Sequence, residues 1–340
     1  MQTEVFRIET PEQFATAVEK AARVLARGEL VAVPTETVYG LAANALDTAA
    51  VRRIYEVKGR PGENPIIVHV DSLAMAQGWC AFWPEAATKL CSAFWPGPLT
   101  MVLPKAASIP LIVTAGGETV AIRWPAHPFM RALITRCQFP LAAPSANLSN
   151  QVSPTTGEHV LRGLDGKIPL LIDAGASNVG IESTVIDLTS VPPRVLRAGM
   201  ISQSQIAQFI PVAIEKGDGN EPASQRTLKS PGLLRKHYAP HAPLVVATWT
   251  NDAELRAIVT NLGFSTSTVS IIAYAHIPGS NDYQRIAVIP HDPDAYARAL
   301  YAELHQSDEV GARLILVEAV PSGDEWQGIR DRLRRASARD

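Results

Sequence analysis

One stretch of this chain, which begins VAVPTETVYG, constrains the fold more than any other. The run LVAV at 30–33 is typical of a buried strand, and Pro34 ends it because proline cannot donate to a central ladder. A predicted helix from about residue 48 then ends at Gly59, since glycine readily takes the left-handed conformation that closes helices. The run PIIVHV at 65–70 predicts a second buried strand. Two strands and a helix in so short a span indicate an α/β scaffold, whose sites usually lie at strand and helix ends.

Polar and charged side chains gather at these element ends. Hydroxyl and carboxylate groups follow the first strand, two cations flank the end of the helix, and an imidazole lies in the second strand; these are Thr35, Glu36, Thr37, Lys58, Arg60 and His69. Guanidinium groups pair well with carboxylate and phosphate, so the pattern predicts a site for a small anion. The alternative is structural, because cations at a helix C-terminus gain from the helix dipole and a histidine in an apolar strand is more often a core residue.

Length and composition predict a folded protein of two domains. The chain has 340 residues, of which 46% are hydrophobic and 19% are charged, and this composition excludes wholesale disorder. The formal net charge is −2 and the sequence pI is about 6.5. A bulk electrostatic binder of nucleic acid would be far more basic, so we expect any RNA contact to be local or indirect.

The sequence also predicts where the protein resides. No apolar run approaches the roughly 18 residues that a membrane span needs, and the N-terminus lacks the continuous apolar core of a secretory signal. The cysteines Cys80, Cys91 and Cys137 form no CxxC pair, so neither a disulfide framework nor a structural zinc site is expected. We therefore expect a cytoplasmic protein with reduced thiols and no membrane association.

The distribution of strand and helix signals divides the chain into three parts. These signals alternate through about residue 210, and their mixed connection lengths favour a mixed sheet in a first domain, 1–210. Residues 211–240 are polar and contain few large apolar groups, which indicates an interdomain linker. Residues 241–340 show the βαβ rhythm of a smaller second domain. The predicted fold class is α/β (α+β).

Familiar catalytic motifs do not occur in this sequence. It contains no GxxxxGK[ST], no GxGxxG after a strand, no HExxH and no Cys/His metal cluster. Further strand ends nevertheless carry hydroxyl, amide or guanidinium groups, in GGETVAIRWP, PLAAPSANLSNQVSPTT, ESTVIDL with VLRAGMI, and SPGLLRKHYAP. Any one such loop is more often an ordinary turn. Their recurrence, with few acids nearby to neutralise the cations, favours one site for an anionic small molecule but does not specify a reaction.

At these segments the chain strongly resembles the threonylcarbamoyl-AMP synthase family, the YrdC-like proteins, in its long two-domain form. The matching motifs run in order through nearly the whole chain: PTETVYGLAANA, KGRPGENPIIVHV, WPGPLT, AIRWPAHP, PSANLS, STVID, VLRAGMI and SPG…HYAP. The resemblance implies a YrdC-like three-layer domain with a twisted mixed sheet, followed by a Rossmann-like α/β domain. It also implies synthesis of L-threonylcarbamoyl-adenylate from L-threonine, bicarbonate or CO₂ and ATP, with release of pyrophosphate.

Carried over motif by motif, the resemblance divides the candidate residues between two substrates. Threonine would be bound by Thr35, Thr37, His69, Arg123, Ala143 and Ser183, with the guanidinium on the carboxylate. ATP would be bound by Lys58, Arg60, Asn64, Thr119, Ser145, Asn147, Ser153 and Arg197, of which the first two would be the catalytic cations, and by His237 and Tyr238 from the linker. The linker departs modestly from the family pattern, because LLRK at 233–236 stands where the family more often has a methionine and an arginine.

The resemblance also implies cofactors and partners. Mg²⁺ would arrive with ATP, held mainly by phosphate oxygens, so no protein metal site is expected. The product would pass to downstream tRNA threonylcarbamoyl-transferase proteins. Two alternatives remain: an RNA-binding or regulatory protein of the same fold without catalysis, and a carbamoyl-transfer enzyme. The near-neutral charge argues against the first, and the small number of cysteines argues against the zinc-finger segments that normally accompany the second.

Overall fold

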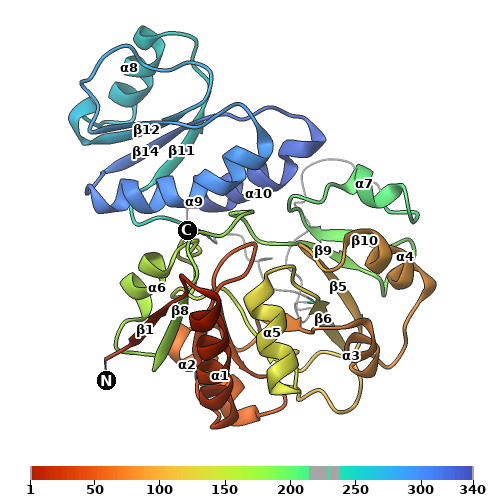
Figure 1. Ribbon diagram of the computed structural model, residues 1–340. Helices are drawn as coiled ribbons and strands as arrows, with labels where there is room; N and C mark the ends of the chain where they lie inside the picture. The colour runs from red at the N-terminus through yellow and green to blue at the C-terminus, as the bar shows by residue number, and fades with distance from the viewer. Residues whose placement is uncertain (1, 214–228, 230–237, 339–340) are drawn as a thin grey trace.

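Two β-sheets form the framework of the protein (Figure 1). The computed structural model describes residues 2–213, 229 and 238–338. The strands of the larger sheet lie between residues 4 and 197, and those of the smaller sheet lie between residues 244 and 318. The predicted domain boundaries remain a prediction, and most of the predicted linker, 211–240, falls outside the described residues.

Helices alternate with the strands in both units. The larger unit contains β1 (Glu4–Arg7), α1 (Pro11–Ala26), β2 (Val31–Val33), β3 (Gly40–Asn44), α2 (Thr48–Lys58), β4 (Val68–His69), α3 (Leu73–Gly78), α4 (Glu85–Phe94), β5 (Leu99–Pro104), β6 (Thr119–Arg123), α5 (Pro128–Cys137), β7 (Leu141–Ala142), α6 (Gly157–Leu164), β8 (Leu170–Asp173), β9 (Thr184–Asp187), β10 (Arg194–Arg197) and α7 (Gln203–Ala207). The smaller unit contains β11 (Leu244–Ala247), α8 (Asp252–Asn261), β12 (Val269–Ala273), β13 (Arg285–Val288), α9 (Pro293–Glu309), β14 (Leu314–Glu318) and α10 (Gln327–Ala336).

Strand pairing confirms the predicted α/β fold class. The larger sheet has the order β1-β8-β2-β3-β7-β4-β6-β5-β9-β10 and contains both parallel and antiparallel neighbours, as a mixed sheet requires. The smaller sheet has the order β11-β14-β12-β13, and these neighbours are all parallel. Parallel neighbours joined by helical crossovers are the arrangement of a Rossmann-like unit.

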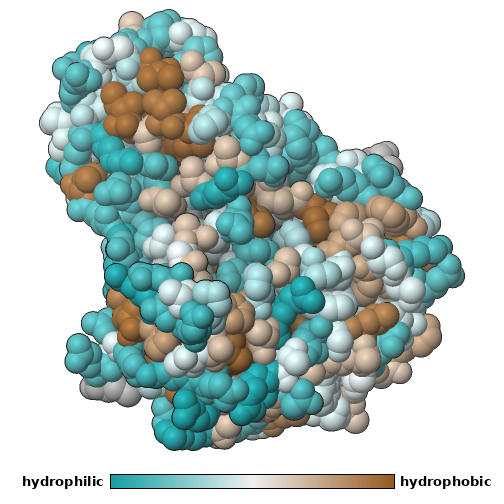
Figure 2. All heavy atoms as spheres, in the orientation of Figure 1, coloured by the Kyte–Doolittle hydropathy of each residue, from teal (hydrophilic) through white to brown (hydrophobic). Residues whose placement is uncertain are grey.

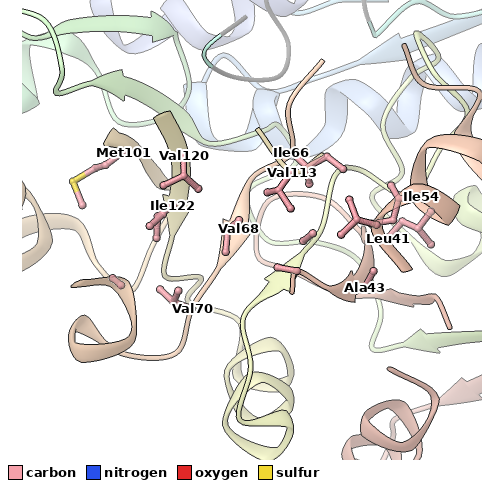
Figure 3. Close-up of a cluster of buried hydrophobic side chains, with 14 of the residues drawn as sticks. Leu41, Ala43, Ile54, Ile66, Val68, Val70, Met101, Val113, Val120 and Ile122 are labelled. Atoms are coloured by element: carbon pink, nitrogen blue, oxygen red, sulfur yellow. The ribbon is translucent and has the colours of Figure 1, made fainter. Parts of the chain in front are cut away.

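Alternation along the strands places hydrophobic cores on opposite faces of the large sheet. Val31 and Val33 of β2 belong to a core with α1 and α5, whereas Ala32 belongs to a core with α2 and α4. Figure 3 shows part of the second core, where Val68 of β4 lies near Ile122 of β6. Helices on both faces of one sheet produce the expected three layers.

The layer formed by α1 and α5 covers only part of its face of the sheet. Its core residues on the sheet come from β2, β3, β7 and β8, whereas farther along the same face a small cluster contains Ala121 and Val185. His69 of β4 is the ladder partner of Arg123 in β6, so these two side chains project from neighbouring strands to one side. The fold therefore leaves a polar region on this face of the sheet.

The smaller unit packs its helices on both faces of its parallel sheet. Leu255 and Val259 of α8 pack with residues of β12 on one face, and α9 and α10 cover the other. Figure 1 shows α9 and α10 between this sheet and the larger unit, with α8 on the far side. In Figure 2, hydrophilic residues cover most of the visible surface, and hydrophobic residues form separate patches.

Glycines allow the two units to approach backbone to backbone. Gly180 has a φ of +89°, and a Cβ there would lie 2.3 Å from the carbonyl oxygen of Ala297 in α9. A Cβ on Gly328 of α10 would lie 2.7 Å from the carbonyl oxygen of Gly199. Both distances are shorter than a van der Waals contact, so any larger side chain at these positions would force the units to shift.

Gly180→Ala is therefore expected to destabilise the protein more than Gly175→Ala. Both glycines have positive φ, +89° and +82°, but a Cβ at Gly175 would have nothing within 4 Å. Each alanine carries a backbone strain of about 1–2 kcal/mol, and overlap with α9 adds to this cost only in Gly180→Ala. Chemical unfolding of both variants and the wild type measures the difference. Equal losses of stability would show that the close approach has no energetic consequence.

Candidate functional site

A small cavity lies in the polar region of the large sheet. Its volume is about 50 Å³, which is room for about four water molecules and too little for a nucleotide. Most of the predicted site residues line this cavity. The structure thereby brings together distant segments of the larger unit, and Tyr238 from beyond it. These lining residues are Thr35, Thr37, Arg60, His69, Arg123, Ala143, Ser145, Ser183, Arg197 and Tyr238.

Arg123 is fixed within the cavity by three contacts. Its Nη1 donates to Oγ1 of Thr37 at 2.9 Å, and its Nη2 forms an ion pair with Oε1 of Glu36 at 2.7 Å. Its Nε donates to the carbonyl oxygen of Gly97 at 3.3 Å. A guanidinium group has five N–H donors. Three of them have partners among the residues described, so two remain for a ligand. The side chain is therefore held in place and can still pair with a carboxylate.

The turn after β2 presents its hydroxyl groups together. Oγ1 of Thr35 lies 3.0 Å from Oγ1 of Thr37 and donates to the carbonyl oxygen of Val38 at 2.6 Å. The backbone N–H groups of Thr37 and Val38 donate back to Oγ1 of Thr35, at 3.2 and 3.3 Å. These bonds fix the turn, so its two hydroxyl groups keep one position at the cavity wall.

His69 is the imidazole of the site. Its side chain is almost fully buried, and its Nδ1 has no hydrogen-bond partner among the described residues. Burial, assisted by the nearby Arg123 charge, lowers the pKa of His69 to about 3. The ring is therefore neutral near pH 7, and Nδ1 can form a hydrogen bond with a ligand hydroxyl or amine.

A second guanidinium group in the cavity wall, that of Arg197, holds the segment that contains Ser183. Its Nε and Nη2 donate to the carbonyl oxygen of Ser183 at 3.1 and 3.0 Å, and Nη2 also donates to Oγ of Ser183 at 3.1 Å. Its Nη1 donates to the hydroxyl group of Tyr238 at 3.4 Å. Tyr238 thus lies in the wall of the cavity, beside the residues that we predicted it would cover. His237 lies outside the described residues.

Arg60 lines the cavity from the end of α2. Its Nε donates to the carbonyl oxygen of Asn64 at 3.0 Å, and its Nη2 donates to that of Pro65 at 2.6 Å. Burial lowers its pKa to about 10, so the group still carries its charge near pH 7. It brings the cavity a third cation, beside those of Arg123 and Arg197.

Lys58 does not line the cavity. Its Nζ donates to the carbonyl oxygens of Ser145, at 2.6 Å, and Asn147, and it lies 3.2 Å from Oδ1 of Asn147. Burial, with the Arg60 charge as a further cause, lowers the pKa of Lys58 well below its usual range. In this structure the lysine supports the loop that carries Ser145, and its predicted contact with the triphosphate remains a prediction.

The other described residues of the prediction also lie outside the cavity lining. Asn64 is fully buried, and neither polar atom of its side chain has a partner among the described residues. Ser153 donates from Oγ to Oε1 of Glu182 at 2.5 Å. Thr119 begins β6, about 13 Å along the strand from Arg123. The roles of these residues in ATP binding, like that of Asn147, remain predictions.

Sequence reasoning placed Glu36 among the polar residues but gave it no role, and it did not select Glu182. We expected few acids near the cations, but Glu36 pairs with Arg123, and Glu182 lines the cavity. Burial raises the pKa of Glu36, but Arg123 and the Ala126 N–H, which donates to Oε1 at 2.9 Å, outweigh burial and lower it. Both acids adjoin residues that the sequence analysis selected. That adjacency was the available signal.

Other groups that could carry chemistry lie apart from the cavity. The cysteines Cys80, Cys91 and Cys137 are free, and burial raises the pKa of each to about 12. Among the described residues, no group of three or more metal-binding side chains occurs. Within the same part of the chain, the helices are too short or too polar to span a membrane.

Family models match both units of the chain. The Sua5, YciO and YrdC family model, described as telomere recombination, matches residues 23–199. A second model, described as the C-terminal domain of threonylcarbamoyl-AMP synthase, matches residues 201–338. Together these matches cover the cavity, the smaller unit and the large sheet except for β1.

Relatives match over nearly the full length. Threonylcarbamoyl-AMP synthase of Pyrococcus abyssi is 41% identical over 321 residues, which are 93% of each chain. That of Bacillus subtilis is 38% identical over 346 residues, which cover 99% of this chain and 98% of the relative. The crystal structure of P. abyssi Sua5 complexed with L-threonine has a TM-score of 0.87 and 38% identity, and the match covers 99% of this chain and 98% of that one. The chain therefore belongs to the threonylcarbamoyl-AMP synthase family.

Proposed function

We propose that this protein synthesises L-threonylcarbamoyl-adenylate from L-threonine, bicarbonate or CO₂ and ATP, and releases pyrophosphate. This reaction is the first step of tRNA threonylcarbamoyladenosine modification. The observation that carries the proposal is a single cavity that joins three guanidinium groups to hydroxyl groups and a neutral imidazole. Full-length relatives with this name, and a related structure complexed with L-threonine, support it.

The amino acid fits the part of the cavity around Arg123. Its two remaining N–H donors can hold a carboxylate, and the planar guanidinium group suits this partner. The hydroxyl groups of Thr35 and Thr37 and the Nδ1 of His69 lie on the same cavity and can bond the amine and side-chain hydroxyl of threonine. A neutral imidazole suits this task because it does not repel an amine.

We assign the nucleotide to the side of the cavity around Arg60, Ser145 and Arg197. Two guanidinium groups there favour phosphate, and the hydroxyl group offers a further donor. The cavity is too small for ATP as it stands, so part of its wall must move to admit the nucleotide. Tyr238 is the lining residue that the sequence assigns to the linker, and its displacement would widen the cavity on this side.

The chemistry requires positioning more than acid–base groups. The amine of threonine first adds to CO₂ and becomes a carbamate. A carbamate oxygen then bonds to the α-phosphorus of ATP, while the bond from this phosphorus to the bridging oxygen breaks and pyrophosphate leaves with the electron pair. Guanidinium groups at fixed positions hold the two reactants in line and stabilise the charge that develops on the phosphate oxygens. A buried cavity also protects the labile adenylate from water.

We propose that Mg²⁺ enters with ATP and that its phosphates supply most of the ligands. Glu182 is the carboxylate that the cavity lining presents, and it is already paired with arginine, which supports this assignment. The adenylate would pass to downstream tRNA threonylcarbamoyl-transferase proteins, with tRNA contact weak or indirect. The free cysteines fit the reducing cytoplasm, where we place the reaction.

Pyrophosphate release from the purified protein tests the proposed function directly. We expect release only when ATP, bicarbonate and threonine are all present, and we expect a chelator of Mg²⁺ to abolish it. Release without threonine would contradict the proposal. Release that persists in the chelator would contradict the assignment of Mg²⁺ alone.

Arg123→Ala is expected to raise the KM for threonine by about thirtyfold or more and to change the KM for ATP little, because truncation of such a charged pair costs about 2–5 kcal/mol. The substitution also leaves the buried Glu36 carboxylate unpaired, which lowers stability. The double variant that combines Arg123→Ala with Glu36→Gln should show the same rise in the KM for threonine without that loss of stability. Arg136→Ala, which removes an exposed partner of Glu19, is the matched control. Equal effects on both substrates would contradict the assigned role.

His69→Gln is expected to make stability less dependent on pH. The pKa of His69 is about 3 in the folded protein and about 6.5 in an unfolded chain, so the unfolded state binds the proton first. The stabilisation is therefore present above pH 6.5 and is lost as the pH falls toward 3, by up to about 1.4 kcal/mol per pH unit. Urea unfolding at pH 4.5 to 7.5 measures the slope, with exposed His291→Gln as control. An unchanged slope would show that His69 is not buried in its neutral form.

A further inference from the structure

Glu182 is a buried carboxylate in the cavity wall, and the smaller unit supplies most of its partners. Its Oε1 accepts a hydrogen bond from Ser153 at 2.5 Å. Its Oε2 accepts one from the hydroxyl group of Tyr301 in α9 at 3.0 Å and one from Nε of Arg332 in α10 at 2.6 Å. Two of these three donors therefore belong to the smaller unit, although the cavity belongs to the larger one.

Arg332 bonds two segments of the larger unit at once. Its side chain has no exposed surface. Besides the carboxylate of Glu182, it bonds the carbonyl oxygen of Glu182 through Nη2 at 3.1 Å and that of Ala198 through Nη1 at 2.8 Å. Glu182 directly precedes Ser183, and Ala198 directly follows Arg197. One side chain thus fixes the neighbours of two cavity residues, which are themselves bonded to each other.

Arg332 also packs on Tyr238. The guanidinium group lies 5.1 Å from the centre of the Tyr238 ring, a distance that allows a cation–π interaction. On the same side, the rings of Tyr238 and Tyr301 are stacked, with centres 6.1 Å apart. The smaller unit therefore also contacts Tyr238, which lines the same cavity as Ser183 and Arg197.

The charge of Glu182 shows why an arginine is needed here. Burial alone raises the pKa of Glu182, but Arg332, then Arg197, outweigh burial and lower it, so the carboxylate is ionised. Without the charge of Arg332, Arg197 would be the cation left to act on this carboxylate. A buried carboxylate that lacks its main partner would compete with an anionic substrate for the Arg197 guanidinium and would repel that substrate.

We propose that Arg332 is a positioning residue of the adenylate-forming site, although it belongs to the other unit. It neutralises Glu182 and ties the Glu182 and Ala198 segments together, so that Ser183 and Arg197 keep their places beside the substrates. The smaller unit is then a working part of the site rather than an independent attachment. The catalytic element of this inference depends on the proposed function, whereas the positioning element does not.

Arg332→Met tests the catalytic element in the full-length protein. We expect the KM for threonine and for ATP to rise by about tenfold or more, with a smaller fall in kcat, because the site is misplaced rather than unfolded. Arg334→Met is the matched control, since Arg334 lies on the same helix, also pairs with Asp331 and is 63% exposed. A fall in kcat with both KM values unchanged, or an equal effect of Arg334→Met, would overturn the proposal.

Two further variants separate charge from packing. Arg332→Lys keeps the positive charge but lacks the planar guanidinium group that bonds both segments, so its KM values should lie between those of the wild type and Arg332→Met. Adding Glu182→Gln to Arg332→Met removes the unpaired carboxylate, so the double variant should recover most of the lost affinity and match Glu182→Gln alone. Additive losses in the double variant would show that the charge of Glu182 is not the cause.

Hydrogen exchange measures the positioning without any reaction. The amides of residues 183–185 and 197–199 should exchange faster in Arg332→Met than in Arg334→Met, while the core of the large sheet keeps its protection. If the wild type releases no pyrophosphate, the proposed function fails, and this exchange result still decides the positioning. Unchanged exchange at both segments would refute the positioning role even in an active enzyme.

Discussion

A charged side chain that leaves water must be paired, and this requirement shapes both walls of the cavity. Arg123 and Glu36 are buried 2.7 Å apart, and Arg332 and Glu182 are buried 2.6 Å apart. Each pair joins segments that are distant in sequence, so neither charge has its partner until the chain has folded around it. Removal of one partner leaves the other charge stranded in the interior, which is more costly than the loss of a contact at the surface. The same pairs that make the cavity polar therefore also fix its walls.

The large sheet determines which side chains reach this cavity. Successive side chains of a strand point to opposite faces, so Val68 joins the hydrophobic core while His69 faces the cavity. The strand ladder then places His69 beside Arg123, although the two residues are far apart in the sequence. Because α1 and α5 cover only part of this face, the remaining strands can carry charged groups there. A hydrophobic layer over the whole face would have excluded the site.

The sequence was enough to predict the helices and strands that have strong local signals, and the site residues that lie at the ends of these elements. The end of α2 at Gly59 and the buried strand β2 follow from such signals. β3 was missed because its sequence, GLAAN, contains no β-branched or aromatic residue, and only its pairing with β2 and β7 makes it a strand. The partners of Glu36 and Glu182 could not be predicted either, because an ion pair between distant segments leaves no local pattern. Residue types at the site were therefore predictable, and their pairing was not.

The positions of Lys58 and Arg60 show how far a sequence motif determines where a side chain lies in the fold. The two cations are separated by one glycine, whose φ of +57° turns the chain at the end of α2. Arg60 consequently lines the cavity, whereas the ammonium group of Lys58 is buried against the carbonyl oxygens of Ser145 and Asn147. Since Ser145 lines the cavity, Lys58 contributes to the site through the loop that it holds. Two cations of one short motif thus take different places, one in the cavity wall and the other in the support behind that wall.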